Sequence, residues 1–349
     1  MAPRRLGSAA FGICLLALSL WPGAVLAAAG DAPGPQLSFI RLGWKPETSE
    51  IRIGDGLGAG AERLLGGRPA AGVLPYPYSD LAWLPAGDGL VFAGAPGLLY
   101  RPLLPERQRL YVRNLASGGL RAIPGTLGAR QPVVAPDGDR IAFVRLQRRP
   151  RQGRNYRSSV WMVRLDGSGL RRIRPWRWDG GEEPASFAPD GRTLLLGRGQ
   201  GHLLVLRLGE GTVTEIATRV WDATFSPDGT RIAMIRLDPE DPEDWYDGEG
   251  PEIDADLFVI SVDGTEETQL TETRAMETSP NWDPSGQRLV FKRRSNLEKE
   301  RAEMDFGDAI YEVNPDGSCL TKVLSAPGKA YLEPTWRPGP GRAAGPITC

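Results

Sequence analysis

The sequence is poor in the side chains that most often carry catalysis and metal binding. Its one histidine, His202, stands before the apolar run Leu203–Leu206, where a structural or incidental role is expected. A single imidazole excludes a His-rich metal site and a pair of catalytic imidazoles. The G-x-S-x-G turn of serine hydrolases is also absent from the sequence. We therefore predict no catalytic residue, no metal ligand and no cofactor.

Long apolar runs are scarce as well and are confined to the beginning of the chain. Residues 1–29 carry two positive charges near their start, Arg4 and Arg5, followed by the apolar run Ala9–Leu20. This run is short for a membrane span, and small residues suited to peptidase cleavage follow it. The order is typical of a cleaved signal peptide. We therefore expect a periplasmic or secreted protein with no membrane insertion after cleavage.

Cysteine is almost as rare as histidine. Cys319 and Cys349 follow the leader, and an exported compartment permits a disulfide between them. A bridge and two unpaired thiols stay equally open, because the sequence does not give the distance between the two Cα atoms. The formal net charge of the chain is −1, which does not indicate nucleic acid as a partner.

Glycine and proline, by contrast, are abundant, with 44 and 31 residues, and they recur in one phrase. The clearest copy, Phe225–Arg236, reads FSPDGTRIAMIR: the end of a strand, a Pro-Asp-Gly turn and a short apolar strand. The prolines of the copies are Pro85, Pro136, Pro189, Pro227, Pro284 and Pro338. Strand-turn-strand units that repeat at roughly 40–50 residues predict a β-propeller.

A second phrase, an apolar strand with a tight turn and a further strand, completes units of four strands. The last repeat proline has no such phrase after it. Strand-like segments without a first strand occur instead at Leu37–Arg41, Glu50–Gly56 and Glu62–Leu65. We therefore predict an all-β, six-bladed β-propeller over residues 36–339, followed by a tail, 340–349. One C-terminal and three N-terminal strands would form the last blade, which removes open sheet edges.

These phrases resemble the TolB-type β-propeller repeat, a relative of WD-repeat propellers that occurs in exported bacterial proteins. The matching residues are Ser226–Ala233 (SPDGTRIA), Ala135–Phe143 (APDGDRIAF) and the turns at Val262 and Leu165. The resemblance covers nearly all of the chain after the leader. It implies the fold more than the function, because the same repeat occurs in peptidases and lyases. TolB carries an α/β domain before its propeller, and we expect no such domain here.

Propeller geometry places the Asp-Gly turns on one face and the long loops between second and third strands on the other, which we call the long-loop face. The second blade's long loop is rich in arginine, and the fourth blade's loop, Asp238–Asp256, is rich in carboxylates that could also bind calcium. We predict that this face binds a protein or peptide partner. The candidate residues are Arg148, Arg149, Arg151, Arg154, Tyr156, Trp176, Trp178, Trp245 and Tyr246. The alternative is a set of solvated loops, with one of Trp176 and Trp178 packed between blades.

Polar residues also recur five positions before the repeat prolines, near one mouth of the central channel. The candidates there are Asp80, Gln131, Asp222 and Glu333. They could hold a cation or a basic peptide end, or they could hydrogen-bond backbone groups where loops enter the sheet. We predict a monomeric, non-enzymatic binding protein. The rival hypothesis is a carbohydrate- or uronate-active enzyme, or a sugar-binding propeller, that uses these carboxylates.

Overall fold

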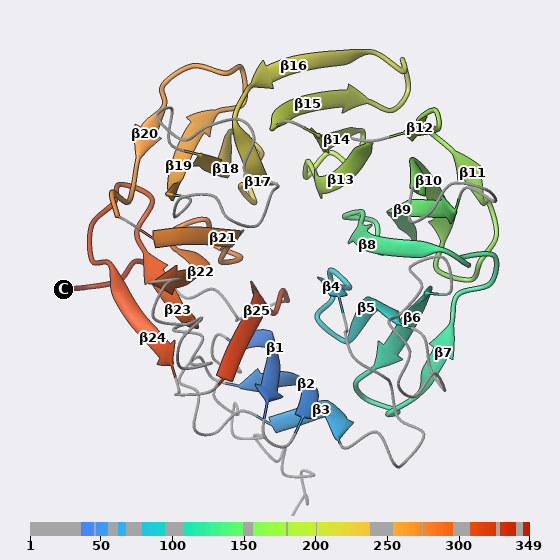
Figure 1. The fold of residues 1–349 in the computed structure, drawn as a ribbon, viewed down its shortest axis with the longest axis horizontal. Coiled ribbons are helices and arrows are strands. Elements are labelled where there is room, and N and C mark those ends of the chain that lie inside the picture. The colour runs from blue at the N-terminus through green and yellow to red at the C-terminus, as the bar shows by residue number, and fades with distance from the viewer. Residues whose placement is uncertain are drawn as a thin grey trace, which may run out of the picture. The chain divides into compact units, whose positions relative to one another are not determined.

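The chain divides into two parts, Met1–Ala32 and Pro33–Cys349, and the computed structural model describes residues of the second part only. The described ranges are 36–44, 47–54, 62–67, 79–94, 108–148, 156–178, 181–199, 201–237, 254–273, 275–295, 308–325, 329–339 and 345–349. Their regular elements are β-strands (Figure 1), so the predicted all-β class is confirmed. Among these residues there is no helix long and apolar enough to cross a membrane.

The strands form antiparallel groups in which most strands pair with the next along the chain; in the second group, β11 and β12 both pair with β10. The first group is β4 (Ser79–Trp83), β5 (Gly89–Gly94), β6 (Arg109–Asn114) and β7 (Leu120–Ala122). The second group is β8 (Ala129–Val134), β9 (Arg140–Arg148), β10 (Tyr156–Arg164), β11 (Arg171–Arg172) and β12 (Arg177–Trp178). The third group is β13 (Glu182–Phe187), β14 (Thr193–Arg198), β15 (His202–Arg207) and β16 (Val213–Ala217).

The next two groups belong to one eight-stranded sheet. The fourth group is β17 (Val220–Phe225), β18 (Arg231–Leu237), β19 (Ala255–Ser261) and β20 (Thr268–Gln269). The fifth group is β21 (Ala275–Trp282), β22 (Leu289–Ser295), β23 (Asp308–Val313) and β24 (Thr321–Ser325). A single parallel pairing, Ala255 with Met276, joins them.

The sixth group combines the two ends of the described chain. It consists of β25 (Lys329–Trp336), β1 (Leu37–Trp44), β2 (Glu47–Gly54) and β3 (Glu62–Gly67). Leu37 pairs with Trp336 and Gly43 with Lys329, so the C-terminal strand lies against the first N-terminal one. The predicted pairing of one C-terminal with three N-terminal strands is confirmed.

Hydrophobic side chains pack between consecutive groups rather than in one central core. In the first cluster, Ile40 and Ile51 of the sixth group contact Trp83 and Phe92 of the first. Six clusters of this kind occur among the described residues, each between neighbouring groups. The strands β4, β8, β13, β17, β21 and β25 contact one another in turn, and β25 returns to β4. Figure 1 shows these six strands around the centre of the ring.

The Pro-Asp-Gly turns have the geometry that their residues predict. In the fourth group, Gly229 adopts a φ of 73°, a left-handed conformation that suits glycine. Asp228 Oδ1 accepts a hydrogen bond from the Thr230 N–H at 3.0 Å, and Ser226 Oγ accepts one from the Arg231 N–H at 3.0 Å. Short polar side chains thus close the turn and lead the backbone into β18.

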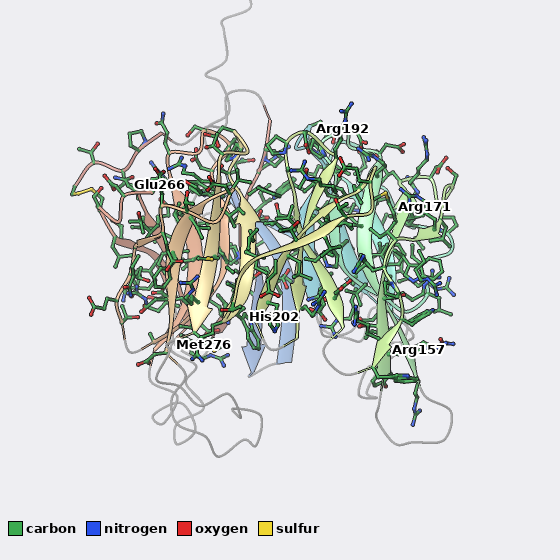
Figure 2. The ribbon with its side chains drawn as sticks, turned by 90° about the horizontal axis from the view of Figure 1, so that it is seen from above. Arg157, Arg171, Arg192, His202, Glu266 and Met276 are labelled. Carbon is green, nitrogen blue, oxygen red and sulfur yellow. A yellow bond between two sulfur atoms is a disulfide. The ribbon has the colours of Figure 1, made fainter. Side chains whose placement is uncertain are left out.

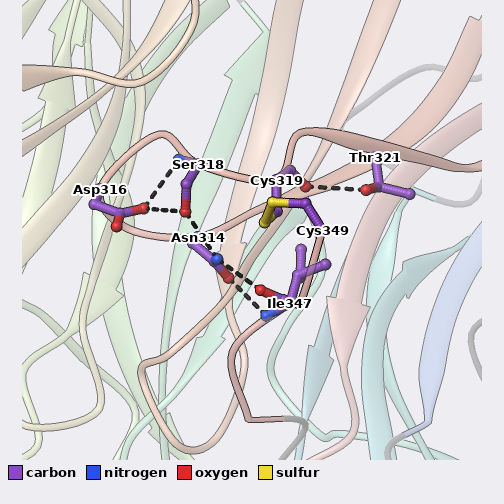
Figure 3. The surroundings of a disulfide bond; sticks show 7 residues. All are labelled: Asn314, Asp316, Ser318, Cys319, Thr321, Ile347 and Cys349. Carbon is purple, nitrogen blue, oxygen red and sulfur yellow. Dashed lines mark hydrogen bonds between the residues drawn. A yellow bond between two sulfur atoms is a disulfide. The ribbon is translucent and has the colours of Figure 1, made fainter.

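The C-terminal residues dock on the turn between β23 and β24 (Figure 3). Cys319 and Cys349 form a disulfide, with their Cα atoms 5.2 Å apart. Asn314 donates to the Ile347 carbonyl at 3.0 Å and accepts from the Ile347 N–H at 2.7 Å. The question that the sequence left open between a bridge and two thiols is therefore answered by the bridge.

Candidate functional site

The innermost strand of each group is interrupted at the repeat position that the sequence assigned to the channel mouth. The strand pairing shifts there in all six groups, as at a β-bulge. Gln131 and Glu333 have φ of 50°, and Ser279 has φ of 56°. Asp80 lies at the bulge of β4, and its side chain is outside the described part of the structure.

Two of the predicted channel-mouth carboxylates bond to backbone groups of the next strand group. Asp222 Oδ2 accepts the N–H of Ser279 at 3.0 Å, and Glu333 Oε2 accepts the N–H of Leu81 at 2.6 Å. Gln131 Nε2 donates to Glu183 Oε2 of the next group at 2.7 Å. The contacts of Asp222 and Glu333 fit the structural interpretation of the pattern, in which the side chains satisfy N–H groups that a bulge leaves out of the ladder, whereas Gln131 binds another side chain.

Two strands carry a further carboxylate, buried two residues before the bulge position of the repeat. Neither carboxylate was among the site residues predicted from the sequence. Glu277 of β21 is fully buried, and Arg293 donates to its Oε1 from Nε at 2.8 Å and from Nη2 at 2.6 Å. Glu182 of β13 is buried too, and it binds Arg174 and Arg198. The sequence does carry a sign of these ion pairs. In four copies of the repeat an arginine stands nine residues after the proline, at Arg145, Arg198, Arg236 and Arg293, and two of these arginines bind the buried glutamates.

The surroundings shift the pKa of these two glutamates in opposite directions. Burial raises the pKa of Glu277 to about 7, because one arginine only partly offsets the loss of water and the Asp256 carboxylate adds repulsion. Burial acts in the same direction on Glu182, but hydrogen bonds from Arg174 and Arg198 outweigh it and leave its pKa lowered. Full burial of the Glu277 side chain fits a role in folding, since a reactant would have to contact it.

A partly exposed series of arginine and tryptophan side chains in mutual contact lies on the second group. The Arg145 guanidinium lies 4.2 Å from the ring centroid of Trp161, which meets Trp176 edge-on at 6.4 Å. The Arg157 guanidinium lies 4.6 Å from the centroid of Trp176 and 5.7 Å from that of Trp178. We call these five residues the arginine–tryptophan stack. Guanidinium groups over indole rings attract electrostatically, so each layer stabilises the next.

The short strand β12 brings Trp178 next to Arg157. It pairs Trp178 with Arg157 and Arg177 with Ser158, so the second group has one strand more than the four predicted. Glu182 anchors the loop that carries β12, because Arg174 binds it and Arg177 Nε lies 3.6 Å from its Oε1. Arg157, at the end of the arginine-rich segment, and the tryptophan pair, which belong to two separate predictions from the sequence, therefore share one edge of the second group.

Arg157 and Trp178 of the stack lie at the end of the strands opposite the short turns, whereas Trp161 lies in the middle of β10. Figure 2 shows Arg157 at one end of the molecule, whereas Arg192 and Glu266, both in short turns, lie at the other. Two more predicted residues accompany it: exposed Arg148 and half-buried Tyr156 face each other across β9 and β10. Trp178 is 42% exposed, whereas Trp176 is half-buried against Trp161 and Arg157 of its own group, so packing of one of the two tryptophans between blades stays a prediction.

Several predicted residues fall outside the described ranges, namely Arg149, Arg151, Arg154, Trp245 and Tyr246. Most of the acidic loop also lies outside them, so its calcium site stays a prediction. His202, expected in an apolar setting, places Nδ1 3.1 Å from Glu215 Oε2 at a partly exposed position on β15. Among the described residues, no group of three or more His, Cys, Asp or Glu side chains could hold a metal ion.

No family model matches this sequence. Among curated proteins, the uncharacterized peptidase YuxL of Bacillus subtilis (strain 168) is 27% identical over 203 residues. The match covers 48% of this chain and 30% of that protein. The chain thus spans less than a third of the length of this relative.

Solved structures resemble the chain over most of its length. TolB from Acinetobacter baumannii has a TM-score of 0.66 at 18% identity, covering 88% of this chain and 68% of TolB. The fold is a TolB-like β-propeller. The putative TolB from Agrobacterium tumefaciens has a TM-score of 0.58 at 13% identity, covering 88% of this propeller and all of that chain. The resemblance predicted from the repeat is confirmed at the level of the fold.

The propeller fold alone leaves open what the molecule does. Hydrazine synthase of Kuenenia stuttgartiensis is similar to 90% of this propeller, with a TM-score of 0.60 and 14% identity, over 48% of its own chain. Enzymes and TolB proteins thus share the architecture, and function must be argued from particular residues.

Proposed function

We propose that this chain is an exported, six-bladed propeller that binds a protein or peptide of the cell envelope through its long-loop face and has no catalytic activity. The observation that carries this proposal is the arginine–tryptophan stack on the second group. Tryptophan and arginine are the side chains most often found at the energetic centre of protein interfaces. Here they are ordered by one another before any partner arrives, which lowers the entropy lost on binding.

The count of six blades rests on packing. Each of the six strand groups buries its own apolar cluster against the next, including the fourth against the fifth. The eight-stranded sheet divides at the single pairing of Ala255 with Met276, which fits two blades that touch at one point. We therefore take every group as one blade, with residues 36–339 as the propeller and 340–349 as its tail.

Export is supported from both ends of the chain. The sequence of residues 1–29 has the order of a signal peptide. The Cys319–Cys349 disulfide suits an oxidising compartment, because cytosolic thiols are kept reduced. We propose a periplasmic or secreted monomer on these grounds.

A binding role accounts for the carboxylates better than a catalytic one. Asp222 and Glu333 accept backbone N–H groups, and Glu182 and Glu277 are bound by arginines inside the sheet. A general acid or base has to reach the substrate, and these carboxylates already serve the fold. The uronate-active enzyme stays the rival hypothesis, and it predicts loss of activity on changing Asp222 or Glu333.

The proposal is tested by capture from envelope extract at low and high salt. The native chain is compared with the variant Arg148→Glu, Arg149→Glu, Arg151→Glu and with Arg171→Glu, Arg172→Glu as a control. The control reverses exposed charges next to the short turns (Figure 2). We expect a protein that the native chain and the control capture, that high salt releases, and that the first variant loses. Equal capture by all three chains, or none by the native chain, would contradict the proposal.

A further inference from the structure

The region around the stack has a strong charge of one sign. Residues 140–178 contain twelve arginines and one carboxylate, Asp166, although the whole chain is nearly neutral. Among the described residues, no carboxylate lies within ion-pair distance of Arg148 or Arg157. Arg177 is 44% exposed and only loosely paired, at 3.6 Å from Glu182. Arg140, Arg164 and Arg174 do have carboxylate partners. Of the described arginines at this edge of the second group, Arg148, Arg157 and Arg177 are therefore the ones whose positive charge is least compensated.

Arg157 is held as a ready hydrogen-bond donor at the centre of the surface that these three arginines form. Gln147 Oε1 accepts from its Nε at 2.8 Å and also from its Nη2. Trp176 and Trp178 fix the plane of the guanidinium group by stacking on it. The remaining N–H groups of the planar fork can receive a carboxylate with two parallel hydrogen bonds. The site is thus pre-organised for a carboxylate beside an exposed indole.

We propose that the partner presents an acidic peptide segment to this surface, with Asp or Glu side chains on Arg157, Arg148 and Arg177 and an apolar side chain against Trp178. The inference rests on the proposed function and names the chemistry of the partner. A chain of uronates has similar charge and would use indole faces for its sugar rings. In this molecule the Arg157 guanidinium already covers one face of Trp176 and of Trp178, which favours the peptide.

The test measures fluorescence anisotropy of a labelled peptide of alternating Glu and Leu, with a Lys and Leu peptide as the charge control. We expect the native chain to bind the acidic peptide alone, and binding to weaken at least about fivefold between roughly 50 and 300 mM salt. Arg148→Glu with Arg177→Glu should weaken it at least about fivefold. The matched reversal Arg192→Glu with Arg207→Glu should leave the affinity within about twofold, because those exposed side chains belong to the third group and not to the group that carries the stack.

Trp178→Ala separates this site from a general attraction between charges. It removes an exposed indole and no charge, so it should weaken peptide binding while leaving the salt dependence unchanged. Circular dichroism and a thermal melt establish that each variant folds. Equal loss in both reversal variants would overturn the proposal, as would native affinity in Trp178→Ala. Tighter binding of polygalacturonate, competed by the same substitutions, would overturn it in favour of the sugar.

Failure here can be told apart from failure of the proposed function. If capture from extract depends on the long-loop face and neither peptide binds, the face is a docking surface and the acidic-peptide chemistry is wrong. If the acidic peptide binds as expected but no protein is captured, the proposal that the surface binds acidic peptides is supported. The proposal that the partner is a cell-envelope protein is then contradicted.

Discussion

At the residue scale, Glu182 and Glu277 occupy the same position of the repeat and meet different surroundings. Both are paired across the two inner strands with the arginine nine residues after the repeat proline, Arg198 and Arg293. Glu182 receives additional positive charge from Arg174 and Arg177, which come from the loop that carries β12. Glu277 instead faces the hydroxyl of Thr271 and the nearby Asp256. The pKa of the glutamate at this repeat position is therefore lowered in the third group and raised in the fifth.

We predict that Glu277 gives the folded chain a distinct pH dependence. Its pKa is about 7 in the folded chain and near the ordinary 4.5 when unfolded. The folded state then binds more protons between these values, so its contribution to stability falls as pH rises through that window. In urea unfolding from pH 5 to 7.5, the native chain should lose on the order of 2–3 kcal/mol more than Glu277→Gln does.

Glu182→Gln is the matched control for this experiment. The pKa of Glu182 is lowered in the folded chain, so its contribution is lost only as pH falls below the ordinary range of a glutamate. Between pH 5 and 7.5 this variant should run nearly parallel to the native chain, whatever its absolute stability. If the Glu277→Gln curve is parallel as well, Glu277 does not titrate in this window.

At the element scale, the sequence predicted strands and turns well and one short strand poorly. The Pro-Asp-Gly phrase defines its own turn, because proline, aspartate and glycine each favour the required backbone geometry. β12 has two residues and no alternating pattern, so no local signal marks it. It forms because Trp178 and Arg157 stack and Glu182 fixes the loop, contacts that become visible only in three dimensions. The stack could be predicted as two separate loops but not as one surface.

The C-terminal tail is a second element whose role the sequence left open. Its disulfide closes a loop that includes β24 and β25, with 30 residues of sequence separation. Arg288 Nε also donates to the Gly345 carbonyl at 3.0 Å. The tail thereby holds the strand that completes the sixth group against the fifth.

We predict that reduction of this disulfide destabilises the propeller by about 3–4 kcal/mol, the size expected from the chain entropy of a loop of this length. Denaturant unfolding with and without reductant measures the change. A variant with both Cys319→Ser and Cys349→Ser should unfold like the reduced native chain and should not respond to reductant. An identical midpoint for the native chain in both conditions means that the tail does not hold the closure strand.

At the scale of the whole molecule, closure of the ring by both ends could be read from the repeat. The unmatched proline at Pro338 and the unmatched strands from Leu37 onward predicted the pairing that β25 and β1 make. That the residues five positions before the repeat prolines form a site at the channel mouth stays a prediction. Their hydrogen bonds depend on bulges in the innermost strands, which arise from tertiary packing. The repeat pattern could not predict which surface binds a partner, because that surface is formed by segments that differ from one group to the next.

The measurement that tests the central claim most directly is hydrogen–deuterium exchange of the native chain, alone and with the protein that it captures from envelope extract. Our account predicts slower exchange in peptides that contain Leu146–Arg148, Tyr156–Ser158 and 176–178, since docking would exclude water from the backbone there. Peptides with the short turns at Asp166–Gly169 and Asp190–Arg192 should exchange unchanged. Protection of those turns, with none around the arginine–tryptophan stack, would contradict the account and place the docking surface on the opposite face.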